Sequence, residues 1–221
     1  MNRSIFRAAG LAALSLLISL PPPAGAQDYE GIKGMGVGLA AGFGKPSDSL
    51  FSGGLSAGLV VSIGLMKYLA VELQGGILMS GVEGSADGLS KGTLNAVPIQ
   101  LSLLVRYPVA GGRLLPFLEM GGGYYLNNFA LDSQLLEDWE QIGFTVEEKV
   151  ENTLGFHFGL GLDYFLSRNL ALGLGFRYGL ANAEAGWSLT DIASSTEVSG
   201  DLESIGLNPL TIALRLRYVF K

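Results

Sequence analysis

Eight stretches of the sequence alternate between large apolar residues and small or polar residues. In Leu55–Leu65, for example, apolar residues take the odd positions, and serine, glycine or valine takes the even ones. The other seven stretches are Gly34–Gly44, Leu69–Met79, Val97–Tyr107, Leu114–Leu126, Leu154–Tyr164, Leu170–Leu180 and Leu210–Phe220. A period of two predicts β-strands, and their length of about 10–13 residues suits tilted strands that cross a membrane. We therefore expect an all-β fold, an eight-stranded antiparallel up-and-down transmembrane β-barrel.

The residues that alternate with the large apolar ones indicate which face of the strands contacts lipid. They include seven charged residues separated by many glycines: Glu72, Arg106, Glu119, Asp163, Arg177, Arg215 and Arg217. Charges of both signs, with little side-chain volume between them, suit the interior of a narrow barrel, where they can pair. The 33 glycines among 221 residues make room there. The large apolar face is therefore expected to point outward into lipid.

The connections between the stretches alternate in length. Short ones lie at Met66–Tyr68, Pro108–Arg113 and Leu166–Asn169, and long ones at Lys45–Gly54, Ser80–Ala96, Asn127–Thr153 and Ala181–Pro209. Outer membrane barrels have short periplasmic turns and longer external loops. Aromatic residues gather near both ends of the strands, as expected for belts at the two membrane interfaces. At the short-turn end these are Tyr68, Tyr107, Phe117, Tyr164, Phe165, Tyr218 and Phe220, and at the long-loop end Phe43, Tyr124, Tyr125, Phe156 and Tyr178.

The first 26 residues are typical of a cleaved signal peptide. Arg3 and Arg7 form a basic start, Ala8–Leu20 is an apolar core too short to span a membrane, and Ala24–Ala26 provides a small-x-small cleavage site. This leaves residues 27–221 as a single barrel domain. Export fits a chain that contains no cysteine and so does not depend on disulfides.

The seven lumenal charges form the candidate functional site. Four arginines face three carboxylates, so the charges nearly balance. Because unpaired buried charges are costly, we expect the seven to pair across strands and close the lumen as a plug. A narrow, gated path for small solutes is the alternative.

Other kinds of site find little support. His157 is the single histidine, and its neighbours Phe156 and Phe158 face lipid, so it is expected to lie inside the barrel as a satisfied polar residue. Some lipid A deacylases have a serine two positions after the histidine, but here that position is Gly159. The glycines of Gly36–Ala41 lie within a strand, unlike those of a dinucleotide-binding turn. We expect no catalytic residue, metal site or cofactor.

The long connections are strongly acidic. They contain fifteen Asp or Glu residues and three lysines, which argues against nucleic acid as a partner. The simplest expectation is that these acids are solvated and bind nothing. Alternatively, they bind lipopolysaccharide through divalent cations, or they bind a cationic partner directly. Within the third long connection, residues 132–143 predict a short helix with Asp132 as its N-cap. Its apolar face is expected to pack on the barrel rim, and a binding site for a partner is the alternative.

Three stretches resemble the small outer-membrane β-barrel family of Gram-negative bacteria, which includes porin-like, adhesin-like and assembly-related members. They are Val97-Pro98-Ile99-Gln100-Leu101 through Arg106-Tyr107, Leu115-Pro116-Phe117-Leu118-Glu119-Met120-Gly121-Gly122-Gly123-Tyr124-Tyr125 and Gly159-Leu160-Gly161-Leu162-Asp163-Tyr164-Phe165-Leu166-Ser167-Arg168-Asn169-Leu170-Ala171-Leu172. The resemblance covers essentially all of residues 27–221 and implies location in the bacterial outer membrane. It also implies that the last strand, ending Tyr218-Val219-Phe220-Lys221, is read by the outer-membrane assembly machinery.

Taken together, these features favour a structural or surface-interaction role for a barrel that displays acidic loops and contacts outer-membrane lipid and lipopolysaccharide. A narrow channel for small solutes is the second reading, and an enzyme that modifies membrane lipid is the third.

Overall fold

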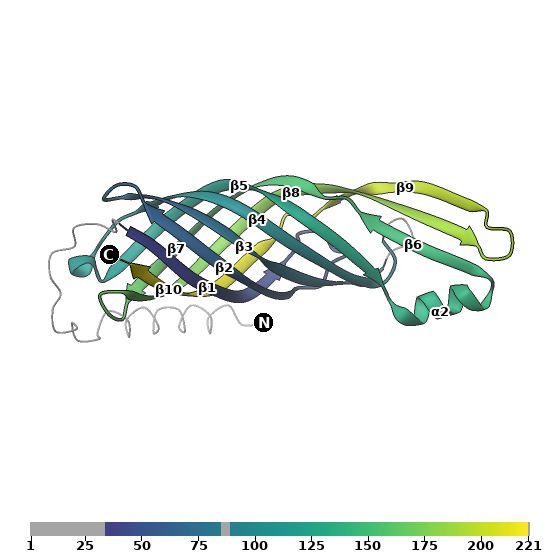
Figure 1. Cartoon of the computed structure of the whole chain (residues 1–221), viewed down its shortest axis with the longest axis horizontal. Helices are drawn as coiled ribbons and strands as arrows, with labels where there is room; N and C mark the ends of the chain where they lie inside the picture. Colours follow the sequence, from purple (N-terminus) through teal and green to yellow (C-terminus); the bar gives the residue numbers. More distant parts are fainter. Residues whose placement is uncertain (1–33, 85–88, 221) are drawn as a thin grey trace.

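The computed structural model describes residues 34–84 and 89–220, so the predicted signal peptide lies outside the described residues. Eight antiparallel strands form a closed, tilted barrel (Figure 1). They are β1 (Gly34–Lys45), β2 (Gly54–Gly64), β3 (Leu69–Val82), β4 (Gly92–Arg106), β5 (Leu114–Leu131), β7 (Thr153–Phe165), β8 (Leu170–Asp191) and β10 (Leu210–Phe220). The predicted fold class is confirmed.

Pairing of the last strand with the first closes the ring. β1 and β10 run antiparallel from Met35 opposite Phe220 to Lys45 opposite Leu210. On its other side β10 pairs with β8, so no barrel strand is left with an open edge through the membrane. Among the described residues, no helix is both long and apolar enough to cross a membrane.

The outer surface of the barrel is a belt of exposed large apolar side chains, including Leu39, Leu101, Leu160 and Leu214. This is the face that the alternation assigns to lipid. Aromatic side chains lie exposed at both ends of the belt. At the short-turn end they are Tyr68, Tyr107, Tyr218 and Phe220, and at the long-loop end Phe43, Tyr124 and Phe156.

Three aromatic residues assigned to the belts are buried instead. Phe117 and Tyr125 alternate with outward-facing Leu118 and Tyr124, so their strand phase turns them into the lumen. Tyr164 is covered by Arg113, whose guanidinium lies 5.1 Å from the ring centroid and donates a hydrogen bond to the hydroxyl. Strand phase, which the sequence-based assignment did not apply, accounts for Phe117 and Tyr125. Tyr164 keeps the lipid-facing phase of β7 and is buried under Arg113.

Two of the predicted loops contain ordered strands. β6 (Phe144–Val150) and β9 (Glu197–Gly206) pair with opposite edges of the outer half of β8, forming a sheet that extends beyond the barrel (Figure 1). Beyond the barrel, Ala183, Ala185, Trp187 and Leu189 continue the lumen-facing phase of β8, which carries Gly175, Arg177 and Gly179 within the barrel, and Ala183 and Ala185 are buried. The strand predicted to end at Leu180 continues to Asp191, and its outward positions become polar beyond Leu180.

The predicted helix is confirmed as α2 (Ser133–Gln141). Asp132 is its N-cap and accepts a hydrogen bond from the backbone N–H of Gln134 at 3.1 Å. The helix packs on β6, with the ring of Trp139 edge-on to Phe144, and not on the barrel rim as predicted. The prediction treated residues 144–150 as part of a loop, whereas they form strand β6, and its Phe144 packs against the helix.

Candidate functional site

All seven charged residues predicted to face the lumen do so in the structure. Six strands supply them, since Glu72 lies on β3, Arg106 on β4, Glu119 on β5, Asp163 on β7, Arg177 on β8, and Arg215 and Arg217 on β10. Their side chains are buried or nearly so, and that of Glu72 has no exposed surface. The seven form one connected group, which we call the lumenal charge network.

Glu72 lies at the centre of this network. It accepts a hydrogen bond from Arg215 Nη2. Its two carboxylate oxygens also lie 3.8 Å from Arg106 Nη2, 3.7 Å from Arg217 Nη1 and 4.0 Å from Arg177 Nη2. One carboxylate therefore faces all four arginines, an arrangement that compensates its complete loss of hydration.

The other two carboxylates share the remaining positive charge. Glu119 Oε1 accepts from Arg177 Nε at 2.7 Å, and Glu119 Oε2 lies 3.8 Å from Arg215 Nη1. Asp163 accepts a hydrogen bond from Arg217 Nη2. Each arginine thus faces at least one carboxylate from another strand, so the network links distant parts of the wall.

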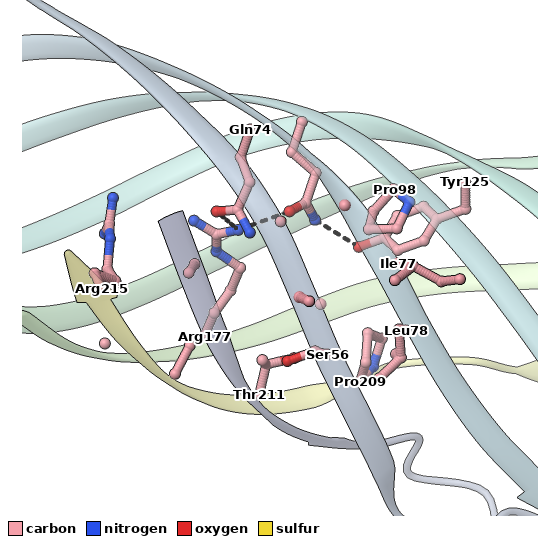
Figure 2. Close-up of a pocket in the computed structure, with 18 of the residues that line it drawn as sticks. Ser56, Gln74, Ile77, Leu78, Pro98, Tyr125, Arg177, Pro209, Thr211 and Arg215 are labelled. Carbon is pink, nitrogen blue, oxygen red and sulfur yellow. Dashed lines mark hydrogen bonds between the residues drawn. The ribbon is translucent and has the colours of Figure 1, made fainter. Parts of the chain in front are cut away.

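A line of neutral polar groups extends the network toward the long-loop end. Arg177 Nη1 donates to Gln74 Oε1 at 2.8 Å and to Gln100 Oε1 at 2.7 Å, and Gln100 Nε2 donates to the Tyr125 hydroxyl at 2.9 Å (Figure 2). Sequence reasoning missed these three residues. Their inward strand phase was available as a signal, because Gln74 follows Glu72 by two positions.

His157 faces the lumen, as its neighbours indicate. Its Nε2 lies 2.7 Å from the hydroxyl of Ser102, and both residues are buried. Among the described residues, His157 Nδ1 has no hydrogen-bond partner, so no carboxylate orients the ring as in a nucleophile–base–acid triad. Ser102 was not predicted as a neighbour of His157, because their contact depends on the register of β4, β5 and β7.

Glycines opposite the charged side chains give them room. A Cβ added at Gly159 would lie 2.7 Å from Glu119 Oε1 and 2.5 Å from the backbone oxygen of Phe176. At Gly173 it would lie 2.4 Å from Asp163 Oδ1. These positions explain part of the high glycine content, because a larger residue would displace the carboxylates.

Clusters of buried apolar residues lie on both sides of the network. Leu115 and Val219 form a buried pair near the short turns, with Phe165 packed against them. Toward the long loops lies a larger group, which we call the apolar cap. It consists of Phe51, Val82, Leu89, Leu94, Tyr125, Phe129, Val150, Ala181, Ala183, Ala185, Ile205 and Leu207.

A cavity of about 70 Å³ lies between the network and the apolar cap (Figure 2). Its polar lining includes Ser56, Gln74, Arg177, Thr211 and Arg215. A second void of about 10 Å³ lies closer to the cap. Leu78, Tyr125 and Pro209 line both spaces and stand between them.

A closed ring of eight antiparallel strands with an apolar exterior and a charged interior defines a transmembrane β-barrel. The sequence matches the family model of the outer membrane protein beta-barrel domain over residues 10–219. The chain therefore belongs to this family and is a bacterial outer membrane protein.

Solved structures of outer membrane barrels share the fold. OprG from Pseudomonas aeruginosa is 18% identical with a TM-score of 0.66, over 87% of this chain and 99% of OprG. Neisserial surface protein A is 13% identical with a TM-score of 0.58, over 85% and 98% of the two chains. A major outer membrane protein from Thermus thermophilus is 14% identical with a TM-score of 0.50, over 83% and 99%. None of the curated proteins matches the sequence.

Proposed function

We propose that this protein is a sealed outer membrane barrel that acts at the cell surface and does not conduct solutes. The lumenal charge network carries this proposal, because it joins six strands through paired side chains at the level where a pore would need open water. In an eight-stranded barrel the side chains themselves can fill the interior. The apolar cap and the pair Leu115 and Val219 add a seal on each side.

The proposed surface role belongs to the sheet of β6, β8 and β9 and to α2. Glu137, Asp138 and Glu140 on α2 are exposed, as are Glu147 on β6 and Glu184 on β8. Such acidic groups suit divalent cations that bridge to the phosphates of lipopolysaccharide, or a cationic partner. Their sign disfavours nucleic acid. We propose lipopolysaccharide as the first partner to test.

We propose no catalytic role. Ser102 and His157 form a hydroxyl–base pair, but both side chains are buried inside the lumen, while the lipid-facing surface is apolar. A lipid substrate in the membrane would therefore meet the wall of the barrel and not this pair.

Recording from refolded protein in planar bilayers tests the seal. We expect little or no steady conductance from the wild-type barrel. Large and stable channels would overturn the proposal and favour the narrow channel for small solutes. Lipid analysis of cells that lack the protein provides a separate test of the absence of enzymatic activity toward membrane lipid.

A further inference from the structure

We infer that the short turns at the periplasmic end bind the headgroups of anionic phospholipids in the inner leaflet, through Lys67 and Arg168. The first observation is the sign of the charge. The charged side chains of the three short turns are Lys67, Arg113 and Arg168, all basic, whereas the long-loop end, where α2, β6 and β9 lie (Figure 1), is acidic. Arg113 is engaged with Tyr164, so the inference rests on the other two. Because short turns face the periplasm, these two cations face the phospholipid leaflet.

Lys67 and Arg168 are available to a ligand. Both are exposed, and within residues 34–84 and 89–220 neither lies at ion-pair distance from a carboxylate. By contrast, Lys149 at the long-loop end lies 2.7 Å from Glu151. The short turns therefore present positive charge that no described carboxylate compensates, and such charge attracts an anionic membrane surface.

The tips of the same two turns are apolar. Met66, directly before Lys67, is 66% exposed, and Leu166, two positions before Arg168, is 47% exposed. An apolar side chain beside a cation suits the membrane interface, where the apolar group contacts lipid and the cation reaches the level of the phosphates. This combination fits a lipid headgroup better than a free anion, which would leave the apolar side chains in water.

Aromatic contacts hold Lys67 at the level of the interface belt. Its Nζ lies 5.2 Å from the centroid of the Tyr68 ring. That ring stacks on Tyr107, at the start of the next short turn, with centroids 6.0 Å apart and planes inclined by 15°. Exposed tyrosines mark the headgroup level of a membrane. The ammonium group of Lys67 therefore lies beside the headgroups.

The two basic turns contact different lipid molecules. The turn with Lys67 joins β2 to β3, and the turn with Arg168 joins β7 to β8, so four strands separate them in either direction around the ring. They lie on opposite sides of the barrel, and a single compact ligand cannot contact both. A leaflet of lipid surrounds the barrel and does. Each basic side chain close to an anionic membrane surface strengthens binding about fivefold.

Electron spin resonance of spin-labelled lipids tests the inference on the refolded barrel in vesicles. We expect the protein to immobilise labelled phosphatidylglycerol in excess over labelled phosphatidylcholine, with a smaller excess at high salt. Lys67→Gln combined with Arg168→Gln should remove most of that excess, and Lys67→Gln alone about half of it. A wild-type barrel that does not distinguish the two lipids, or a double variant with full selectivity, would overturn the inference.

Lys45→Gln is the matched control. Lys45 is an exposed lysine at the long-loop end of β1, without a carboxylate partner among the described residues. Its replacement changes the net charge as Lys67→Gln does, but at the acidic end of the barrel, and should leave the selectivity unchanged. Equal losses in the two variants would trace the selectivity to net charge and count against the turns. Lys67→Arg keeps the charge in place and should keep the selectivity.

Peptidoglycan is the competing anionic partner on this side of the membrane. Retention of the wild-type protein on purified peptidoglycan that the double variant loses, together with no preference for phosphatidylglycerol, would refute the lipid assignment. Heat modifiability shows that each variant is folded before the comparison. Neither the lumenal charge network nor the acidic surface enters the experiment, so its result is independent of the proposed function.

Discussion

Glu148 on β6 holds Ser90, which lies 58 residues earlier in the chain, through both of its carboxylate oxygens. Oε2 accepts from the backbone N–H of Ser90 at 2.8 Å, and Oε1 accepts from its hydroxyl at 2.5 Å. The residue before Ser90 is Leu89, which is completely buried in the apolar cap. This double hydrogen bond therefore ties the connection between β3 and β4 across the mouth of the barrel.

Glu148→Ala should loosen the apolar cap at Leu89. Hydrogen bonds to a charged group contribute about 1.5–3 kcal/mol each when they are well shielded. Because these two are only partly buried, we expect the free energy that holds this connection in place to fall by an amount near the lower end of that range. Faster hydrogen exchange in residues 89–91 of the intact protein is the measurement. Glu147→Ala, at the exposed neighbouring position, is the control. Equal exchange in the two variants would show that the hydrogen bonds do not hold the cap.

Glu119→Ala should destabilise the barrel and open it intermittently. The change removes the carboxylate that accepts a hydrogen bond from Arg177, which is also the second carboxylate near Arg215. Breaking a buried pair on one side costs about 3–5 kcal/mol, because the remaining charge stays buried without compensation. Unfolding in vesicles measures the loss, and single-channel recording should show brief openings. Glu184→Ala, an exposed acid on the extended part of β8, should change neither.

The barrel could be predicted from the sequence because the alternating pattern shows where the strands lie and which of their residues face lipid or the lumen. The same phase placed the seven charges of the network inside, from Glu72 on β3 to Arg217 on β10. Which of them meet depends on register and tilt, which the alternation does not contain. The contacts of Arg177 with Gln74 and Gln100, and that of Ser102 with His157, were missed for this reason.

The alternating pattern also does not show how much space a side chain has on the lumenal side of the wall. From phase alone, Gly159→Ser is expected to be a mild change, because a small polar residue would face a polar interior. The structure contradicts this expectation, since a Cβ at Gly159 would lie 2.5 Å from the backbone oxygen of Phe176. The sequence marks the side that Gly159 faces but not the close approach of β8. This variant is therefore a poor control for changes on the lipid face.

Leu160→Arg tests the lipid-facing surface with a better control. Leu160 lies within β7 and is 54% exposed, whereas Val198 on β9, beyond the barrel, is 57% exposed. An arginine near the middle of the membrane costs about 2–4 kcal/mol, and outside it close to nothing. Refolding titrations in vesicles should show that loss for Leu160→Arg and almost none for Val198→Arg. Similar losses would place the two residues in the same environment and contradict the assigned membrane position.

The acids of α2 are expected to bind lipopolysaccharide through divalent cations. If so, Mg²⁺ or Ca²⁺ should strengthen binding of purified lipopolysaccharide, and neutralising Glu137, Asp138 and Glu140 together should remove most of that gain. Neutralising Glu147, Glu197 and Asp201 together, the same number of acids on the extended sheet, measures how much of the gain that sheet contributes. If lipopolysaccharide binding did not depend on Mg²⁺ or Ca²⁺, the proposed cation bridge would be wrong, and the acids of α2 would be ordinary solvated charges.

Phe220→Ala tests whether the assembly machinery reads the last strand. Phe220 lies outward on β10 opposite Met35, and its ring contacts that of Tyr218 at 5.0 Å between centroids. Phe43 is the matched control, an aromatic residue of similar exposure, 52% against 48%, at the other end of the barrel. Both alanine variants remove one exposed aromatic side chain, so refolding of the purified proteins in vesicles should be affected about equally.

In cells the two variants should differ. A machinery that recognises the aromatic residue near the end of β10 would insert Phe220→Ala poorly and Phe43→Ala normally. The measurement is the amount of heat-modifiable, folded barrel in isolated outer membranes, normalised to total synthesis. Equal insertion of the two variants would mean that Phe220 serves the interface belt alone. Poor insertion of Phe220→Ala together with normal refolding in vesicles would assign the defect to recognition, because the barrel itself would have kept its capacity to fold.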